Sequence, residues 1–460
     1  MRKKLIFFIC LAVCLQTIAF AQMQGVITNS SERFSRAIQP EVNTIKVEKL
    51  DNENIITLCR ESNISYFCNT TLNSPTVDYG IIPQNLDVYD FKIYKDYIIM
   101  CGADLNSHGF IGVVNAADLF SGTGQLGYYE VDYTIVVYDL ECYIDVNNHL
   151  KVMALGYDLY TKHFLIDYDL SDMSTPYYLY LTSKVLYRMA QTDNYISIVF
   201  SEPSSTEFGV IRHDKNNISN YQSQIWRFAG GTLYSGHSLT PQDRGTYFLI
   251  ENIDNTDEVC VATAVRSHPP YTSGGVPIVV YNVDVSSLSL NSTQVIQTYG
   301  KTKLKDMEYT PIDNTLHIIN KNDIFSIDST NPNSWDTTIL YSIDVIHRLQ
   351  VYPTITPYLS EIIIPSNNLE YDDYINSITK YTDNHYIVGG KSSNTSSIYW
   401  FDRRYITNAS TCYMSFLSNI DLSTATPIGT LTYNVFYSQK TFQLFSCPNG
   451  NTLYFNTCTD

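Results

Sequence analysis

The chain has 460 residues, of which 44% are hydrophobic, 13% aromatic and 16% charged. This composition excludes a disordered tail and a coiled coil, because such chains contain few aromatic residues. The formal charge of −17, from 46 acidic and 29 basic residues, disfavours a nucleic-acid partner, since phosphate binding depends on lysine and arginine.

Residues 1–21 have the three-part layout of a secretory signal peptide. Arg2, Lys3 and Lys4 form a cationic start, an apolar run follows, and Ala19-Phe20-Ala21 supplies small residues before an expected cleavage at Gln22. A membrane anchor is the alternative, but the apolar run is shorter than the ~20 residues that cross a bilayer. We therefore expect a mature chain of residues 22–460 outside the cytoplasm, in the periplasm, at the cell surface or secreted, without an integral membrane segment.

Eight of the ten cysteines lie in the predicted mature chain. An oxidising compartment favours disulfides, whereas buried free thiols that pack as small hydrophobic groups are the alternative. No Cys or His spacing indicates a zinc site, and the acidic stretches 254–258 and 370–373 lack the spacing of a calcium loop. We accordingly expect no metal and no cofactor.

Short runs rich in Val, Ile, Tyr, Phe and Thr recur along the mature chain, separated by Asn, Asp, Gly and Ser clusters, which indicates β-strands and turns. Many of the turns share one form, in which an apolar run is followed by Asp-Asn or a near equivalent and then by a second apolar run. Asn and Asp suit this place because they tolerate left-handed backbone. The turn positions in chain order are 51, 96, 147, 193, 243, 313, 383 and 439. A strand, a polar loop and a further strand follow these turns, as in Ile98–Ala103 and Phe110–Asp118.

This repeat resembles the β-propeller superfamily, whose blades are four-stranded sheets that stack radially into a closed ring. The resemblance implies an all-β fold with about eight four-stranded blades, seven being the alternative, in a single domain over residues 22–460. Tyr386–Gly390 followed by Tyr399-Trp400 looks like a kelch unit, and no particular propeller family is indicated. A tandem of β-sandwiches is the other fold compatible with short strands and turns.

The propeller resemblance also implies where a ligand would bind. The loops between the second and third strands lie on one rim, where propellers usually meet their ligands. On that rim we expect Asp104, His108, Tyr157, Tyr160 and Glu202 to be the ligand-binding residues. Tyrosine offers an apolar ring and a polar tip, which suits a carbohydrate, peptide or protein ligand.

The sequence contains no HExxH, GxSxG, Walker or dinucleotide motif. We therefore predict a non-catalytic binding module at the cell envelope for a polysaccharide, peptide or protein partner. The alternative is an envelope glycoside hydrolase or lyase with two acid/base carboxylates from different blades in the central channel. A structural subunit of an envelope assembly is a third interpretation.

Overall fold

The computed structural model describes residues 24–26, 42–52, 54–61, 64–71, 77–82, 86–121, 125–131, 135–158, 163–170, 177–182, 184–201, 206–228, 231–233, 248–267, 277–296, 301–311, 314–327, 335–351, 360–365, 374–382, 385–392, 395–402, 414–416, 426–435, 438–446 and 452–456. The predicted leader, residues 1–21, lies outside this set. Among the described residues, no helix is long and apolar enough to cross a membrane.

The chain forms successive antiparallel sheets, which we call blades and number in chain order. Blade 1 contains β2 (Val42–Lys49), β3 (Asn54–Glu61), β4 (Ile64–Thr71) and β5 (Val77–Ile81). Blade 2 contains β6 (Leu86–Tyr94), β7 (Tyr97–Asp104), β8 (Gly109–Asn115) and β9 (Gln125–Val131), with β1 (Gln24–Val26) on its outer edge and helix α3 (Ala116–Ser121) after β8. Blade 3 contains β10 (Ile135–Ile144), β11 (Leu150–Asp158), β12 (His163–Asp169) and β13 (Tyr177–Thr182). Blade 4 contains β14 (Val185–Gln191), β15 (Tyr195–Ser201), β16 (Glu207–Asp214) and β17 (Asn217–Arg227).

The later sheets follow the same plan. Blade 5 contains β19 (Phe248–Ile253), β20 (Glu258–Ser267), β21 (Ile278–Asp284) and β22 (Ser289–Ile296), and β18 (Gly231–Leu233) also pairs with β20. Blade 6 contains β23 (Lys301–Thr310), β24 (Thr315–Ile327), β25 (Trp335–Gln350) and β26 (Ser360–Pro365). Blade 7 contains β27 (Tyr374–Thr382), β28 (His385–Ser392), β29 (Thr395–Asp402) and β30 (Met414–Phe416). The last sheet contains β31 (Thr426–Val435), β32 (Ser438–Ser446) and β33 (Thr452–Asn456).

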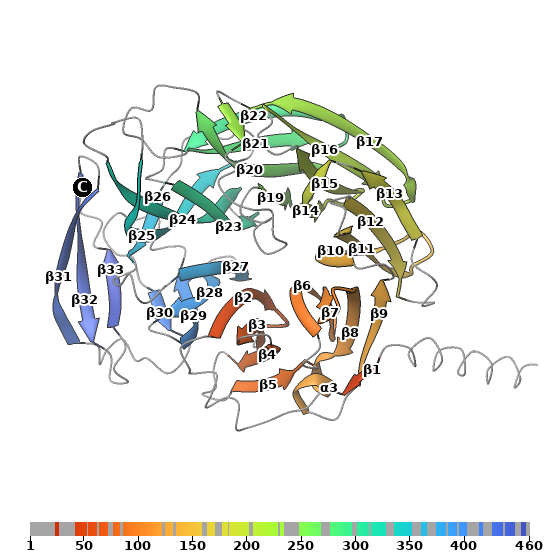
Figure 1. The fold of residues 1–460 in the computed structure, drawn as a ribbon, viewed down its shortest axis with the longest axis horizontal. Coiled ribbons are helices and arrows are strands. Elements are labelled where there is room, and N and C mark those ends of the chain that lie inside the picture. Colours follow the sequence, from red (N-terminus) through yellow and green to blue (C-terminus); the bar gives the residue numbers. More distant parts are fainter. Residues whose placement is uncertain are drawn as a thin grey trace, which may run out of the picture.

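Blades 1 to 7 close a ring around a central axis, so the predicted all-β propeller fold is confirmed (Figure 1). The first strands of consecutive blades contact one another from β2 through β6, β10, β14, β19 and β23 to β27, and β27 returns to β2. The sheet β31–β33 is not among them: it lies outside the ring, where β33 contacts β26 of blade 6 (Figure 1). The eight repeat units therefore correspond to eight sheets, and the ring itself has the alternative count of seven.

The turn after the first strand of a blade is the feature that the repeat had identified. Asn148, Asn255 and Asn314 take positive φ angles of 62°, 60° and 55° at these turns, as expected for a residue that tolerates left-handed backbone. The turn assignment at residue 243 was wrong. In blade 5 the turn between β19 and β20 follows Ile253, which pairs with Glu258, and residues 242–245 lie outside the described residues.

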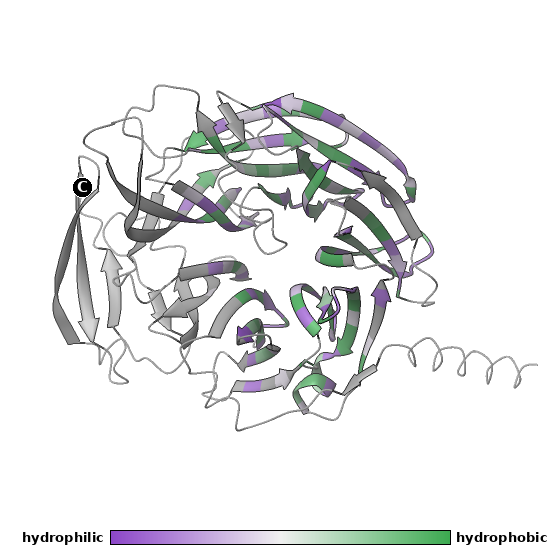
Figure 2. Cartoon of the chain, viewed as in Figure 1, coloured by the Kyte–Doolittle hydropathy of each residue, from purple (hydrophilic) through white to green (hydrophobic). Residues whose placement is uncertain are grey.

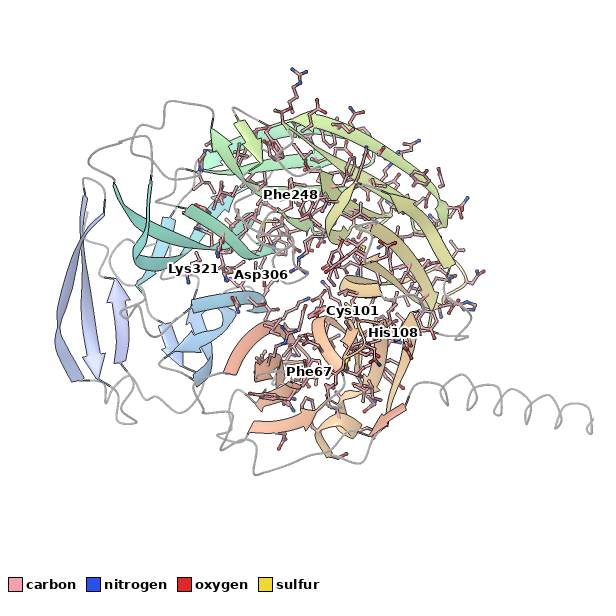
Figure 3. All side chains as sticks on the ribbon, viewed as in Figure 1. Phe67, Cys101, His108, Phe248, Asp306 and Lys321 are labelled. Carbon is pink, nitrogen blue, oxygen red and sulfur yellow. The ribbon has the colours of Figure 1, made fainter. Side chains whose placement is uncertain are left out.

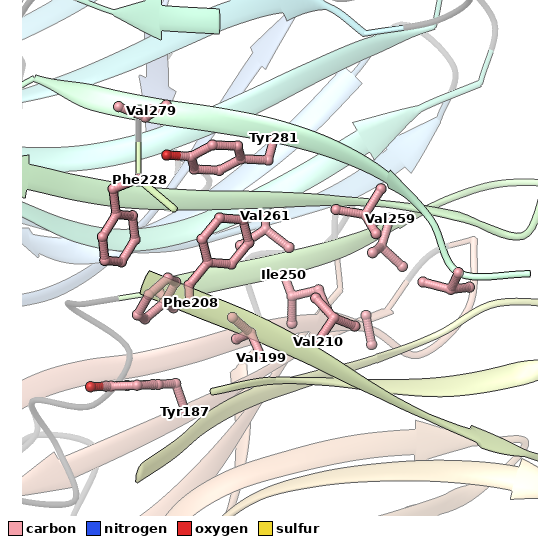
Figure 4. Close-up of a cluster of buried hydrophobic side chains, with 14 of the residues drawn as sticks. Tyr187, Val199, Phe208, Val210, Phe228, Ile250, Val259, Val261, Val279 and Tyr281 are labelled. Carbon is pink, nitrogen blue, oxygen red and sulfur yellow. The ribbon is translucent and has the colours of Figure 1, made fainter. Parts of the chain in front are cut away.

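The hydrophobic core is divided among the interfaces between blades (Figure 2). Between blades 4 and 5, the ring centroids of Phe208 and Tyr281 lie 4.5 Å apart (Figure 4). Those of Tyr187 and Phe248 lie 4.7 Å apart, and Phe248 is labelled in Figure 3. All four rings are almost fully buried, and a buried aromatic ring of this size contributes roughly 1.5–3 kcal/mol. Stacking against both neighbours thus stabilises a sheet that buries neither face alone.

The described cysteines are free thiols, all of them buried: Cys59, Cys68, Cys101, Cys142 and Cys260. Cys412, Cys447 and Cys458 lie outside the described residues. Cys59 and Cys68 occupy the paired strands β3 and β4, and a hydrogen bond with Cys59, together with burial, raises the pKa of the Cys68 thiol. These five cysteines therefore pack as small hydrophobic groups and do not form the disulfides that an oxidising compartment favours.

Candidate functional site

The ring encloses a polar cavity of about 220 Å³ on its axis. Residues from the first strand of every ring blade, β2, β6, β10, β14, β19, β23 and β27, line this cavity. Its charged residues are the acids Glu48, Asp90, Asp139, Glu141, Glu251, Asp306 and Glu308 and the bases Lys46, Lys92, Lys305 and Arg188. Acidic groups outnumber basic ones, so the cavity favours a cationic group.

A β-bulge in the first strand explains why charged side chains reach the axis. In the first strands of blades 1, 2, 3, 4, 6 and 7, the pairing with the second strand shifts by one residue within the first few residues of the strand. A bulge turns the following residue to another face of the strand. The residues directly after the bulge, which we call the bulge level, are Lys46, Asp90, Asp139, Arg188, Asp306 and Ser377. Side chains two residues further along, which share the same face, include Glu48, Lys92, Glu141 and Glu308.

The bulge level joins consecutive blades by hydrogen bonds. Asp139 Oδ2 of blade 3 accepts the Met189 backbone N–H of blade 4 at 2.7 Å, and Asp306 Oδ2 of blade 6 accepts the Ile378 N–H of blade 7 at 2.9 Å. Ser377 Oγ in turn accepts the Val47 N–H of blade 1 at 3.1 Å, across the point where the ring closes. These side chains satisfy backbone donors on the free edge of the next first strand, and this role is structural.

Three of the four cavity cations, Lys46, Lys92 and Arg188, lie on the side of blades 1 to 4, where they form ion pairs with acids. Lys305 is the fourth, and it lies on β23 of blade 6. Lys46 Nζ lies 2.8 Å from Asp90 Oδ1 and 3.0 Å from Glu48 Oε1. Arg188 lies 2.7 Å from Asp139. Although burial opposes ionisation of Asp90, the positive charges of Lys46 and Arg188 outweigh it and lower the pKa of Asp90. Asp139 differs from Asp90, because burial outweighs the charge of Arg188 and raises the pKa of Asp139 to about 7. Both acids nevertheless have cationic partners within the chain.

Lys92 and Glu141 form a further ion pair on this side of the cavity, between blades 2 and 3, with Nζ 2.9 Å from Oε1. The negative charge of Glu141 outweighs burial and raises the pKa of Lys92. Lys92 is thereby held in its charged form.

Glu251 of β19 and Glu308 of β23 differ from the other acids, because within the described residues neither forms an ion pair with lysine or arginine. Glu308 accepts one hydrogen bond, from the Lys380 backbone N–H at 3.1 Å. Burial in the wall, followed by the charge of Glu308, raises the pKa of Glu251. Burial, followed by the charges of Glu48 and Asp306, raises the pKa of Glu308 to about 8. The two residues lie on neighbouring blades, and we call them the Glu pair; a bound cation would oppose the rise in both pKa values.

Of the residues predicted to bind ligand, the structure describes Asp104, His108 and Tyr157. Asp104 ends β7 and His108 precedes β8, so both belong to a connection between second and third strands, as expected. The two side chains meet at the rim, where His108 Nδ1 lies 3.5 Å from Asp104 Oδ2.

Tyr157 is part of the packing around the cluster between blades 3 and 4, with its ring centroid 6.1 Å from that of Tyr138. Tyr160 and Glu202 lie outside the described residues. A ligand-binding role for these five residues stays a prediction.

The predictions from loops and motifs did not include the cavity residues. A sequence pattern that indicates them is nevertheless present in most of the first strands, just before the turns. The segments Val88-Tyr89-Asp90-Phe91-Lys92, Val137-Tyr138-Asp139-Leu140-Glu141 and Leu304-Lys305-Asp306-Met307-Glu308 share a charged–apolar–charged pattern. On a strand this alternation places both charged residues on one face and the apolar residue on the other. Aligning these segments, as the turns were aligned, identifies the channel.

No protein-family model matches the sequence, and no curated protein matches it. Among solved structures, prolyl oligopeptidase B from Galerina marginata is 10% identical with a TM-score of 0.46, and the match covers 90% of this chain and 57% of that one. A structure titled the Dos1 propeller is 9% identical with a TM-score of 0.44, covering 95% and 96% of the two chains. Raptor from Chaetomium thermophilum is 9% identical with a TM-score of 0.47, covering 88% and 31%. The present chain thus spans little more than half the length of the oligopeptidase, and its fold is assigned from its own strand pairing and ring closure.

Proposed function

We propose that the protein is a non-catalytic binding module whose central channel accepts the primary ammonium group of a ligand, in particular a lysine side chain or amino terminus of a peptide or protein. The Glu pair carries this proposal, because it is the part of the channel wall without a cationic partner among the described residues. An ammonium group supplies the charge and the hydrogen-bond donors that the two carboxyl groups lack.

The size of the cavity supports a small inserted group. Its volume of about 220 Å³ is below the ~300–1,000 Å³ of pockets that enclose drug-sized ligands. A single side chain or a small polar group suits this space, so the rest of a larger ligand would lie on the rim.

Calorimetric titration with small lysine probes tests the proposal. The probes are Nα-acetyl-lysine-methylamide and its Nε-acetylated form, which lacks the charge. We expect binding of the first probe alone, and a loss of about 10-fold or more in Glu251→Gln, since hydrogen bonds to charged groups contribute ~1.5–3 kcal/mol. Glu207→Gln is the matched control, because Glu207 begins β16 away from the cavity and faces Arg227. Equal binding of both probes, or equal affinity of the two variants, would refute the proposal.

The pH dependence of this titration has a definite sign. Glu308, whose pKa is about 8, must lose its proton before it pairs with an ammonium group. Affinity should therefore rise from pH 6.5 to pH 9, and the rise should be smaller in Glu308→Gln. Glucosamine and N-acetylglucosamine serve as a second pair of probes and distinguish an amino sugar from a peptide amine.

The paired carboxyl groups also favour a second candidate function, glycoside hydrolysis by an acid/base pair in the channel. A carboxyl group that keeps its proton near neutral pH is suited to protonate a leaving group, and Glu308 meets this condition. Hydrolysis of 4-nitrophenyl glycosides by the wild-type protein, abolished in Glu251→Gln and in Glu308→Gln, would establish this function. Absence of turnover across the common glycosides would leave the binding module.

Action outside the cytoplasm belongs to the same proposal and rests on the leader-like residues 1–21. Expression in a secreting host followed by amino-terminal sequencing tests it. A mature chain that begins at Gln22 is expected, and an intact amino terminus on a cytoplasmic protein would contradict it.

A further inference from the structure

Two connections in neighbouring blades have the same sequence pattern and the same backbone geometry. Asp104-Leu105-Asn106-Ser107-His108 joins β7 to β8, and Asp145-Val146-Asn147-Asn148-His149 joins β10 to β11. In each, Oδ1 of the aspartate accepts the backbone N–H groups two and four residues later, at 2.7–2.9 Å. The fourth residue, Ser107 or Asn148, has a φ of 62°. Each loop thus fixes a carboxylate and an imidazole side by side.

In the first loop, a third side chain completes a cluster of ligand atoms. Glu130 lies on β9, beside Phe110 of β8, and its Oε1 is 2.7 Å from His108 Nδ1. Asp104 Oδ2 is 3.5 Å from the same nitrogen, and it also accepts the Asn106 side-chain amide at 3.3 Å. One ligand atom from each of Asp104, His108 and Glu130 lies within 4.8 Å of the others.

The His108 nitrogen is the decisive atom of this cluster. Its Nδ1 is buried and has no hydrogen-bond partner of adequate geometry, although two carboxylate oxygens stand close to it. Among the described residues, no lysine or arginine forms an ion pair with Asp104 or Glu130. A ring nitrogen and two carboxylate groups therefore converge on one point, and no described lysine or arginine pairs with them.

We propose that Asp104, His108 and Glu130 bind a divalent transition-metal ion of the Zn²⁺ class at the rim of blade 2. Imidazole nitrogen with two carboxylate oxygens suits zinc, whereas calcium and magnesium take oxygen ligands. Zinc ligands at ~2.0–2.1 Å from the metal stand roughly 3.3 Å apart in a tetrahedron, and the observed separations of 2.7 Å and 3.5 Å bracket that value. His108 and Glu130 are 35% and 42% exposed, which leaves room for water as the fourth ligand.

The second loop provides the contrast within the same molecule. There His149 Nδ1 lies 3.2 Å from Asp169 Oδ2, and Asp145 completes a similar set of groups. Lys151 Nζ, however, lies 3.5 Å from Asp169 and 3.7 Å from Asp167. The ammonium group already supplies the positive charge at this cluster, so the metal is assigned to the first loop only.

Metal content and affinity test the proposal in the purified protein. After incubation with Zn²⁺ and gel filtration, bound zinc is measured by mass spectrometry, and its affinity is measured by competition with a chelating dye. The variants are His108→Gln and Glu130→Gln, and His149→Gln is the matched control. Circular dichroism verifies that each variant is folded, and the exposure of Glu130 makes Glu130→Gln the milder change.

We expect the His108→Gln/Glu130→Gln double variant to lose one zinc ion per chain, and each single variant to bind zinc at least about 10-fold more weakly. His149→Gln should bind as the wild-type protein does. Cobalt substitution should give visible absorption bands that disappear in His108→Gln. The proposal is overturned if the wild-type protein retains no zinc, which would leave an imidazolium–carboxylate ion pair, or if the metal is lost in His149→Gln instead.

Discussion

The two sides of the channel wall are built on the same strand pattern but differ in how their acids are satisfied. On the side of blades 1 to 4, Asp90 and Asp139 each face a cation at 2.7–2.8 Å. On the side of blades 5 and 6, Asp306 is satisfied by a hydroxyl and backbone N–H groups, and the Glu pair lacks a cation among the described residues. The same scaffold therefore supports one side whose acids have cationic partners within the chain and one side whose Glu pair has none among the described residues.

This difference separates stability from binding. Removing a partner from the paired side leaves a buried charge, whose cost is large. Removing an acid from the Glu pair removes a carboxyl group whose ionised form is disfavoured by burial and by nearby like charges, so we expect little loss of stability. The following substitutions test this separation, from the largest expected effect to the smallest.

Arg188→Met should destabilise the protein most, by about 3 kcal/mol, because it leaves Asp139 without its cation. The Asp139 side chain is only 5% exposed, so water cannot replace the guanidinium group. Urea denaturation measures the loss. The double variant Arg188→Met/Asp139→Asn should recover much of it, and a double variant as unstable as the single one would contradict the ion-pair explanation.

Asp306→Ala should cost about 2 kcal/mol, because it removes the acceptor for both Ser377 Oγ, at 2.7 Å, and the Ile378 N–H. The loss should be concentrated at the contact between blades 6 and 7. Hydrogen exchange of the Ile378 amide should increase in this variant, whereas exchange at the Met189 amide, in blade 4, serves as the control. Unchanged exchange at Ile378 would show that the hydrogen bond does not hold the two blades together.

Glu308→Gln should have the smallest effect, and its sign should depend on pH. In the folded protein the pKa of Glu308 is about 8, against an ordinary value of 4.5, so between these values the folded state holds a proton that the unfolded state has lost. This group therefore makes the wild-type protein less stable as pH rises through that window. The variant should melt at nearly the wild-type temperature at pH 5 and roughly 2 °C or more above it at pH 8.5. A constant difference across this range would contradict the raised pKa.

Local features of the fold were predictable from the sequence, because each blade repeats the same strand and turn chemistry. The aspartate and asparagine turns indicated the boundary between first and second strands, and Asn148 and Asn314 take the left-handed backbone that explains their choice. Membership of the ring was not predictable in the same way. The sheet β31–β33 has the same local pattern as a blade, and its exclusion from the ring depends on contacts between sheets.

The position of the turn between β19 and β20 in blade 5 was not predictable from the sequence either. Its residues 254–257 are polar and acidic, which resembles a solvated loop, and the segment at 242–245 has similar turn chemistry. Only the pairing of Ile253 with Glu258 distinguishes them. The proposed zinc cluster was not predictable for the same reason, because it also depends on strand pairing. Glu130 is 22 residues from His108 in the chain and is brought to it by the pairing of β8 with β9.

The channel residues are the largest group of site residues that sequence analysis did not identify. Asp90, Glu251 and Glu308 are far apart in the chain, and the charged–apolar–charged pattern that contains Asp90 and Glu308 does not extend to Glu251. Their convergence results from ring closure, and their raised or lowered pKa values result from burial and from charged neighbours, most of them in other blades. Sequence analysis named two channel carboxylates as the basis of an alternative function, but it could not identify which ones.

The alternation along the first strands has a consequence for how such a protein changes over evolutionary time. Val47, Phe91, Leu140 and Met307 are buried in the interfaces between blades, while the charged residues on either side of each reach the axis. The residues that pack between blades and the residues that line the channel thus occupy separate, alternating positions of one short segment. Exchanging the charged positions blade by blade would give a family of channels with different ligand preferences on an unchanged hydrophobic framework, which makes the ring a scaffold for design.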